Sequence, residues 1–164
     1  MSMPSVSRVL LACGCLLLIL CEGARADVSV SIRGVVMAPV PCVVNGGSTL
    51  DISFGNEVVT NRVDGLNYRV TVPYTVTCGP QPTNSMTLTL RGSGAGFDSA
   101  VLRTSKNDLG VKLLVSGVAW PLNRALNFTY PTLPRMEAVL VKNPGRTLTG
   151  GGFSATATLV VALR

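Results

Sequence analysis

The sequence predicts an all-β protein, a sandwich of short strands, on three observations. Runs in which apolar and polar residues alternate recur between residues 68 and 163, and this period of two is that of a strand with one buried face. Turn-forming clusters of Gly, Asn, Asp and Pro separate the runs. No stretch carries a long helical apolar period with caps. Short strands with turns between them favour a β-sandwich.

Five runs are expected to form strands, and the first of them is interrupted. Pro73 has no backbone N–H to donate, so we expect a sheet edge or a bulge at that point. The runs are Tyr68 to Cys78, Met86 to Leu90, Val111 to Val115, a weaker one around Ala138 and Leu140, and Phe153 to Leu163. The turn signals are Asn45-Gly46-Gly47, Asp64-Gly65, Gly79-Pro80, Ser93-Gly94-Ala95-Gly96, Asn143-Pro144-Gly145 and Gly150-Gly151-Gly152.

The first 26 residues are expected to be a signal peptide. Arg8 precedes the apolar run 9–20, and Ala24-Arg25-Ala26 has the small-x-small pattern of a signal-peptidase site, which predicts cleavage after Ala26. A lipoprotein site at Cys21 is an alternative, although the bulky Leu20 stands where such a site takes a small residue. The mature chain, residues 27–164, has the length of one domain.

Cleavage leaves two cysteines, Cys42 and Cys78, and in an exported chain two cysteines predict one disulfide. Two buried free thiols are the alternative. The whole chain carries 14 basic and 8 acidic residues, and loss of the signal peptide leaves 12 and 7, a net charge of +5. The basic residues are scattered rather than clustered, which argues against a nucleic-acid partner.

The residues needed for common catalytic and metal chemistry are missing or dispersed. The chain contains no histidine, the commonest general base and metal ligand. The glycine-rich stretch 91–96 is not followed by the Gly-Lys-Ser/Thr of a phosphate loop. We therefore expect neither an enzyme nor a bound metal or cofactor.

The start of the mature chain is unusual. An apolar alternation precedes Pro39-Val40-Pro41-Cys42, and the prolines limit continuous pairing between this alternation and the next segment of the chain. An ordinary first strand and an arm that pairs with another molecule are both compatible with this pattern. The alternating positions are Val28, Val30, Ile32, Gly34 and Val36.

The order of these segments resembles the minor pilins of chaperone–usher fimbriae, in particular the small adaptor subunits of pilus tips. The resemblance spans the precursor and rests on segments 26–36, 41–42, 51–56, the strand that ends at Cys78, and 150–158. It implies an incomplete immunoglobulin-like β-sandwich that lacks its seventh strand and has an N-terminal donor-strand extension. The extension would be residues 27–40 and the pilin domain residues 41–164. The donor positions would be Val28, Val30, Ile32, Gly34 and Val36, with strand exchange beginning around Ile32 and Gly34.

The resemblance also implies an acceptor groove beside the last strand. Gly151 is the fourteenth residue from the C-terminus, where the family carries a glycine, and Leu163 stands where the family favours a tyrosine. The groove and chaperone contacts would be Gly151, Phe153, Ala155, Ala157, Leu159, Val161, Leu163 and Arg164, with the carboxylate of Arg164 held by basic residues of the chaperone.

The implied partners are a periplasmic pilus chaperone, an outer-membrane usher, an adhesin and neighbouring pilins. The implied destination, by way of the periplasm, is the cell-surface fimbrium, at its tip. Two other roles stay open: a major or other minor pilin of the rod, and a single-domain adhesive pilin that binds carbohydrate. In the second case Trp120 or Tyr130 would stack on a sugar.

Overall fold

The computed structural model describes residues 30–36 and 42–164. The predicted signal peptide, Val28 and the prolines Pro39 and Pro41 lie outside the described residues. The chain divides into two units, Met1–Val36 and Met37–Arg164. Over the ranges that the structure describes, no helix has the length and apolar character needed to cross a membrane.

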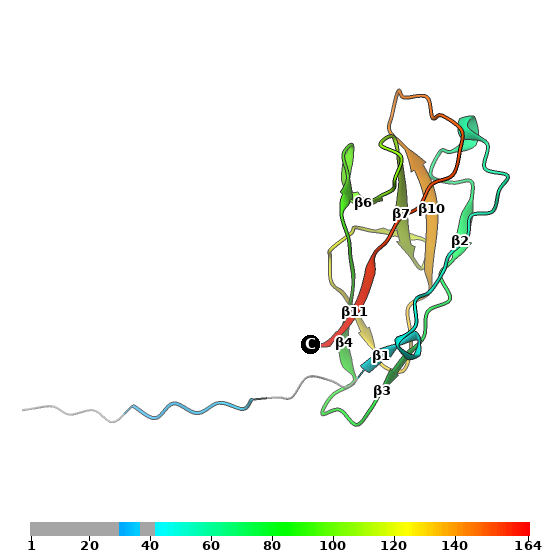
Figure 1. Cartoon of the computed structure of the whole chain (residues 1–164). Helices are drawn as coiled ribbons and strands as arrows, with labels where there is room; N and C mark the ends of the chain where they lie inside the picture. The colour runs from blue at the N-terminus through cyan, green and yellow to red at the C-terminus, as the bar shows by residue number, and fades with distance from the viewer. Residues whose placement is uncertain (1–29, 37–41) are drawn as a thin grey trace, which may run out of the picture. The chain divides into compact units, whose positions relative to one another are not determined.

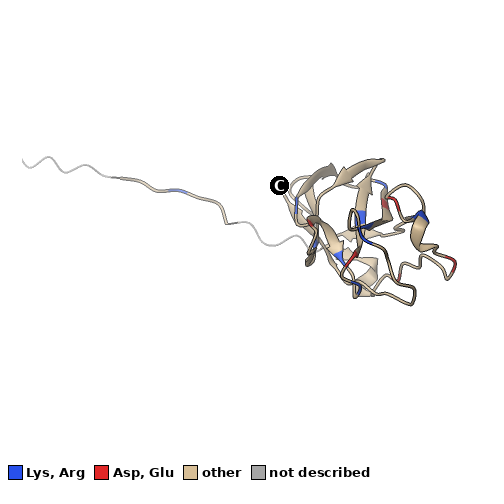
Figure 2. Cartoon of the chain, turned by 90° about the horizontal axis from the view of Figure 1, so that it is seen from above, with Lys and Arg blue, Asp and Glu red and all other residues tan. Residues whose placement is uncertain are grey.

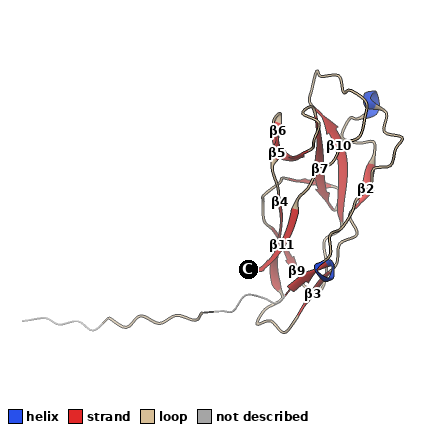
Figure 3. Ribbon diagram, viewed as in Figure 1, coloured by secondary structure: helices blue, strands red, loops and turns tan. Residues whose placement is uncertain are grey.

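The regular structure of the second unit consists of strands and two short helices, joined by loops (Figures 1 and 3). Two single-turn 3-10 helices, η1 (Asn45–Gly47) and η2 (Thr60–Arg62), lie in its loops. The strands are β1 (Cys42–Val44), β2 (Arg69–Thr71), β3 (Val76–Cys78), β4 (Ser85–Arg91), β5 (Gly94–Ala95), β6 (Asp98–Arg103), β7 (Leu109–Val115), β8 (Val118–Trp120), β9 (Leu126–Thr129), β10 (Met136–Lys142) and β11 (Thr158–Leu163).

The strands form three antiparallel sheets. The largest has the order β2-β10-β7-β6-β5, with β8 also paired to β7. A second sheet has the order β11-β4-β9, and a third consists of β1 and β3. Leu88 of β4, Leu113 of β7 and Leu140 of β10 belong to one core cluster, so the large sheet packs face to face with the second. This is the predicted β-sandwich.

The sequence pattern located most of the strands that build the core. The runs Met86 to Leu90 and Val111 to Val115 lie in β4 and β7, and the weaker run around Ala138 lies in β10. The run from Tyr68 to Cys78 divides into β2 and β3, and Pro73 lies between them. At this break the chain stops pairing with β10 and starts pairing with β1, as expected for a residue without a backbone N–H.

The predicted C-terminal strand is shorter than its alternation suggested. Only residues from Thr158 onward pair with β4, and residues 153–157 form no strand. Upstream, the backbone N–H of Ser105 donates to the carbonyl of Ser154 at 2.8 Å. Ser105 follows β6, so the chain at Ser154 is bonded to the large sheet and joins β4 only later. Period-two patterning does not reveal this change of partner.

Tyr74 gives the domain a pH-dependent contact. Its ring is 8% exposed and its hydroxyl donates to the carbonyl of Pro134 at 2.6 Å. Burial raises the pKa of Tyr74 to about 12. Because the folded state holds the proton more tightly than an unfolded tyrosine with a pKa near 10, its stabilising contribution is complete below about pH 10 and falls as the pH rises through about 12.

We expect the Tyr74→Phe variant to lose about 1 kcal/mol at neutral pH, from the missing hydrogen bond. Its unfolding free energy should then decline less steeply than that of wild type between pH 10 and 12. Urea unfolding at pH 8, 10 and 11 measures both effects. Parallel profiles for the two proteins would contradict the assignment to Tyr74.

Gly110 of β7 lies where no side chain fits. A Cβ there would collide with Cγ1 of Val101, and would also lie 3.2 Å from the carbonyl oxygen of Leu102 and 3.3 Å from the ring of Phe97. We expect Gly110→Ala to destabilise the domain by about 1–3 kcal/mol through overpacking. Gly96 has open space around it, so Gly96→Ala is the matched control and should change stability by about 0.5 kcal/mol or less. Equal urea midpoints for the two variants would refute the expectation.

Candidate functional site

β1 and β11 each have one side without a strand partner in the described part of the domain. β1 pairs with β3 on one side only, and β11 pairs with β4 on one side only. β1 and β11 are neighbours in space, although no ladder joins them (Figure 1). One extra strand paired with both would connect the two small sheets in the order β3-β1-strand-β11-β4-β9, once β1 and β11 stand two strand spacings, about 9.5 Å, apart. An unpaired edge of this kind is a template for β-strand addition.

The side chains along β11 suit such an addition. Leu159 and Val161 are half-buried and pack against the main core, and Leu163 is half-buried at the end of the strand. Phe153, upstream of β11, packs against Phe54 with the ring centroids 6.0 Å apart. These apolar groups are only partly removed from water, so covering them would release further hydrophobic free energy.

The other predicted acceptor residues are more open. Ala155 and Ala157 are exposed and outside any strand, and Arg164 is exposed at the chain end. Its backbone N–H donates to the carbonyl of Ser85 at 3.1 Å, which continues the β11–β4 ladder. Gly151 is exposed with φ +106, a conformation that L side chains rarely adopt. The structure thus brings Phe153, Leu159 and Val161 onto the core, leaves Leu163 half-buried, and leaves the other predicted positions exposed.

The β1 side supplies wall residues that the sequence pattern did not single out. Val44, Leu50 and Phe54 are half-buried and pack against the same core as Leu159 and Val161. Segment 51–56 was indicated only by the family resemblance. Its isolated apolar residues show no long alternation, so only their tertiary position reveals that they could line a groove opposite β11.

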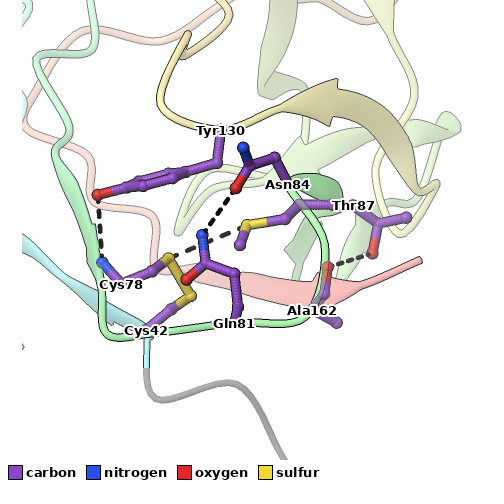
Figure 4. The surroundings of a disulfide bond; sticks show 8 residues. Cys42, Cys78, Gln81, Asn84, Thr87, Tyr130 and Ala162 are labelled. Carbon is purple, nitrogen blue, oxygen red and sulfur yellow. Dashed lines mark hydrogen bonds between the residues drawn. A yellow bond between two sulfur atoms is a disulfide. The ribbon is translucent and has the colours of Figure 1, made fainter.

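The disulfide predicted between Cys42 and Cys78 is present, and it ties β1 to β3 (Figure 4). The sulfur of Cys78 lies 3.9 Å from the sulfur of Met86 in β4. The backbone N–H of Cys78 donates to the hydroxyl of Tyr130 at 3.4 Å. The bond therefore fixes the β1 edge against the layer that also carries β11.

The described part of the first unit, residues 30–36, forms no strand and exposes its apolar side chains. Val30, Ile32 and Val36 are 79%, 92% and 98% exposed. Val35, which lies outside the predicted alternation, is also 90% exposed. Gly34 has open space around it. Large apolar groups left in water in one short segment indicate a contact surface for another chain.

The charged residues of the described ranges are spread over the domain (Figure 2). No group of three or more Cys, Asp or Glu side chains there could hold a metal ion. Lys and Arg occur on several separate elements of the domain (Figure 2). The candidate site is the pair of free edges of β1 and β11, with half-buried apolar side chains along them.

The fimbrial protein family matches residues 30–164 of the chain. The chain belongs to this family. As a fimbrial pilin of the chaperone–usher type it is a structural subunit rather than an enzyme, and its place is in a surface fimbrium with other pilins.

Relatives and solved structures agree with this assignment. The chain is 33% identical over 142 residues to the fimbrial-like protein YfcQ of Escherichia coli K12, covering 83% of this chain and 87% of YfcQ. It is 28% identical over 162 residues to the E. coli fimbrial adapter PapF, covering 87% and 92%. The P pilus rod subunit PapA has the same fold, with a TM-score of 0.63 and 18% identity over 74% of this chain and 97% of PapA. The all-β pilin fold expected from the sequence is confirmed.

Proposed function

We propose that this fimbrial pilin is a minor adaptor at the pilus tip, joining an adhesin to the next pilins of the fibre by donor-strand exchange. The observation that carries the proposal is the pair of unpaired edges, β1 and β11, in a chain that also exposes an apolar arm at residues 30–36. One feature accepts a strand and the other supplies one, so each subunit can link two neighbours.

The physics of strand addition sets the order of partners. A sandwich with an open edge and partly exposed core aggregates unless it is covered, which calls for a periplasmic chaperone to occupy the edge first. At the outer-membrane usher, the arm of the next pilin replaces the chaperone strand. Main-chain hydrogen bonds along β11 would supply affinity, and alternate apolar side chains of the arm would supply specificity.

The adaptor role draws its support from similarity to PapF, which is itself described as a fimbrial adapter. A carbohydrate-binding role is less favoured because Trp120 is only 6% exposed and its indole N–H already donates to the carbonyl of Arg124 at 3.0 Å. Tyr130 is half-buried and its hydroxyl accepts from Cys78. Neither ring is free to stack on a sugar.

Mixing experiments separate an adaptor from a rod pilin. Chaperone-bound copies of this chain alone are expected to exchange strands with one another slowly and to form no long polymer. Co-expression with the chaperone and the candidate adhesin should give a ternary complex that an affinity tag on the adhesin retrieves. Rapid growth of homopolymers, seen as a ladder of heat-resistant bands on a gel, would make this chain a rod subunit instead.

A further inference from the structure

The connection between β10 and β11 is fastened to the turn between β6 and β7. At its start, the backbone N–H and the side-chain amide of Asn143 donate to the carbonyl and to Oδ1 of Asp108, each at 2.8 Å. Nε of Arg146 lies 3.7 Å from the same carboxylate oxygen. This end of the connection is therefore held where it leaves the large sheet.

The far end of the connection has its own anchors. Nζ of Lys106 donates to the carbonyl of Gly150 at 2.9 Å. The backbone N–H of Ser154 donates to Oγ of Ser105 at 3.1 Å, and its carbonyl accepts from the N–H of Ser105 at 2.8 Å. These bonds lie on either side of Gly151, whose φ of +106 is one that L side chains rarely adopt.

A buried hydroxyl group stabilises the turn between β6 and β7 through hydrogen bonds within the turn. Thr104 is 4% exposed. Its Oγ1 accepts from the N–H of Lys106 at 3.1 Å and lies 2.8 Å from the carbonyl of Leu109, to which it donates. Lys106 and Ser105 thus project from a turn with a satisfied internal hydrogen-bond network, and they hold a connection that has no strand pairing of its own.

Only residues 155–157 separate the anchored Ser154 from Thr158, the first residue of β11. The four steps from Ser154 to Thr158 span at most about 13–14 Å when fully extended. Because both ends are fixed, the path of this short segment is restricted. The segment continues the free edge of β11 beyond its N-terminal end. Phe153 packs on the core next to Ser154, so the anchors at Gly150 and Ser154 act together with this contact to keep the segment on the line of the edge.

We propose that Lys106 and Ser105 are positioning residues for strand acceptance: they hold residues 150–154 so that 155–157 extend the open edge of β11. The inference rests on the proposed function, since it concerns the same edge. It adds a specific role for a lysine and a serine that lie outside the edge itself. The effect is preorganisation: a segment that is aligned before binding loses less conformational entropy when a strand pairs with it, so the strand binds more tightly.

The test uses a strand-complemented form, the full chain with a second copy of residues 27–36 joined after Arg164 by a linker of about four Gly and Asn residues. The hairpin places the added strand antiparallel to β11. A reference form carries Ile32→Ser in the added copy only, which weakens the added strand. The form with the intact added strand and this reference form are compared twice, once with the wild-type domain and once with Lys106→Met in the domain. The readouts are urea unfolding and amide hydrogen exchange over residues 155–163. Lys142→Met is the matched control, since Lys142 lies at the end of β10 and, among the described residues, donates no hydrogen bond to the connection.

In wild type we expect the intact added strand to stabilise the protein over the Ile32→Ser reference and to protect the amides of 155–163. In Lys106→Met we expect this stabilisation, expressed as an equilibrium constant, to shrink about three- to tenfold. Protection should fall by a similar factor over 155–157 and stay near wild type over 158–163. Lys106→Arg should restore both the stabilisation by the added strand and the amide protection over 155–157. Ser105→Ala should reduce both quantities, as Lys106→Met does.

The proposed function and the positioning role fail in different ways. If the added strand neither stabilises nor protects the wild-type protein, strand acceptance at β11 is wrong. If it does both in wild type and equally in Lys106→Met, strand acceptance stands and the positioning role is overturned. A lysine with a merely structural role would lower the stability of both forms alike and leave their difference unchanged.

Discussion

Deletion of residues 28–36 is expected to leave a domain that folds and binds its chaperone but no longer enters the groove of its acceptor. Each of Val30, Ile32 and Val36 would contribute about 1.5–3 kcal/mol on burial in a partner, before ordering costs. Loss of all three, together with the main-chain hydrogen bonds, should reduce incorporation to background. Pull-down with the tagged acceptor subunit measures incorporation, and co-purification with the chaperone confirms folding.

The other face of the arm supplies the matched control. Replacing Ser29, Ser31 and Arg33 with Ala keeps the predicted apolar face and the length of the arm, so incorporation should stay within a few-fold of wild type. If the deletion variant still assembles, the arm does not link this subunit to its acceptor. If incorporation of the alanine variant falls as far as that of the deletion variant, the acceptor does not recognise the arm by its alternating apolar side chains.

Removal of the disulfide has the second large expected effect. Cys42 and Cys78 are separated by 36 positions. Constraint of a loop of this length stabilises a folded domain by about 3–4 kcal/mol in the loop-entropy model. In the strand-complemented form, the double variant Cys42→Ala, Cys78→Ala should lose stability of that order in urea unfolding, a large part of the total for a domain of this size.

The disulfide variant should also lose strand acceptance beyond its loss of stability. The bond holds β1 to β3, and β1 is one of the two edges that an added strand would pair with. In the strand-complemented form, the gain from the added strand should therefore shrink when both cysteines are replaced. An unchanged gain would mean that the added strand pairs with β11 alone.

The interior of the sandwich could be predicted from the sequence because the alternation of apolar and polar residues is visible within each of its longer strands. Leu88 lies in a clean alternation and Leu113 in one interrupted by the buried Leu114, and both Leu88 and Leu113 face the core. β10 shows a weaker alternation because Val139 and Val141 on its second face are buried too. The short strands β8 and β9 carry too few residues for a period to show.

The candidate site could be predicted only in part. The resemblance located β11, and Leu159 and Val161 lie against the core as an acceptor wall requires. The late start of β11 depends on Ser105, which is distant in sequence from Ser154, so no local pattern encodes it. The opposite wall, with Leu50 and Phe54, likewise exists only after folding brings segment 42–58 beside the last strand.

The most direct test of strand acceptance is the stability of the strand-complemented form against the same chain without the added strand. We predict that the chain alone aggregates or is degraded when expressed without a chaperone. With the added copy of residues 27–36 it should become a soluble monomer that unfolds reversibly in urea, because the added strand buries two or more apolar side chains. A stable, monodisperse monomer without the added strand would mean that the sandwich is already complete, and would contradict strand acceptance as the function of this edge.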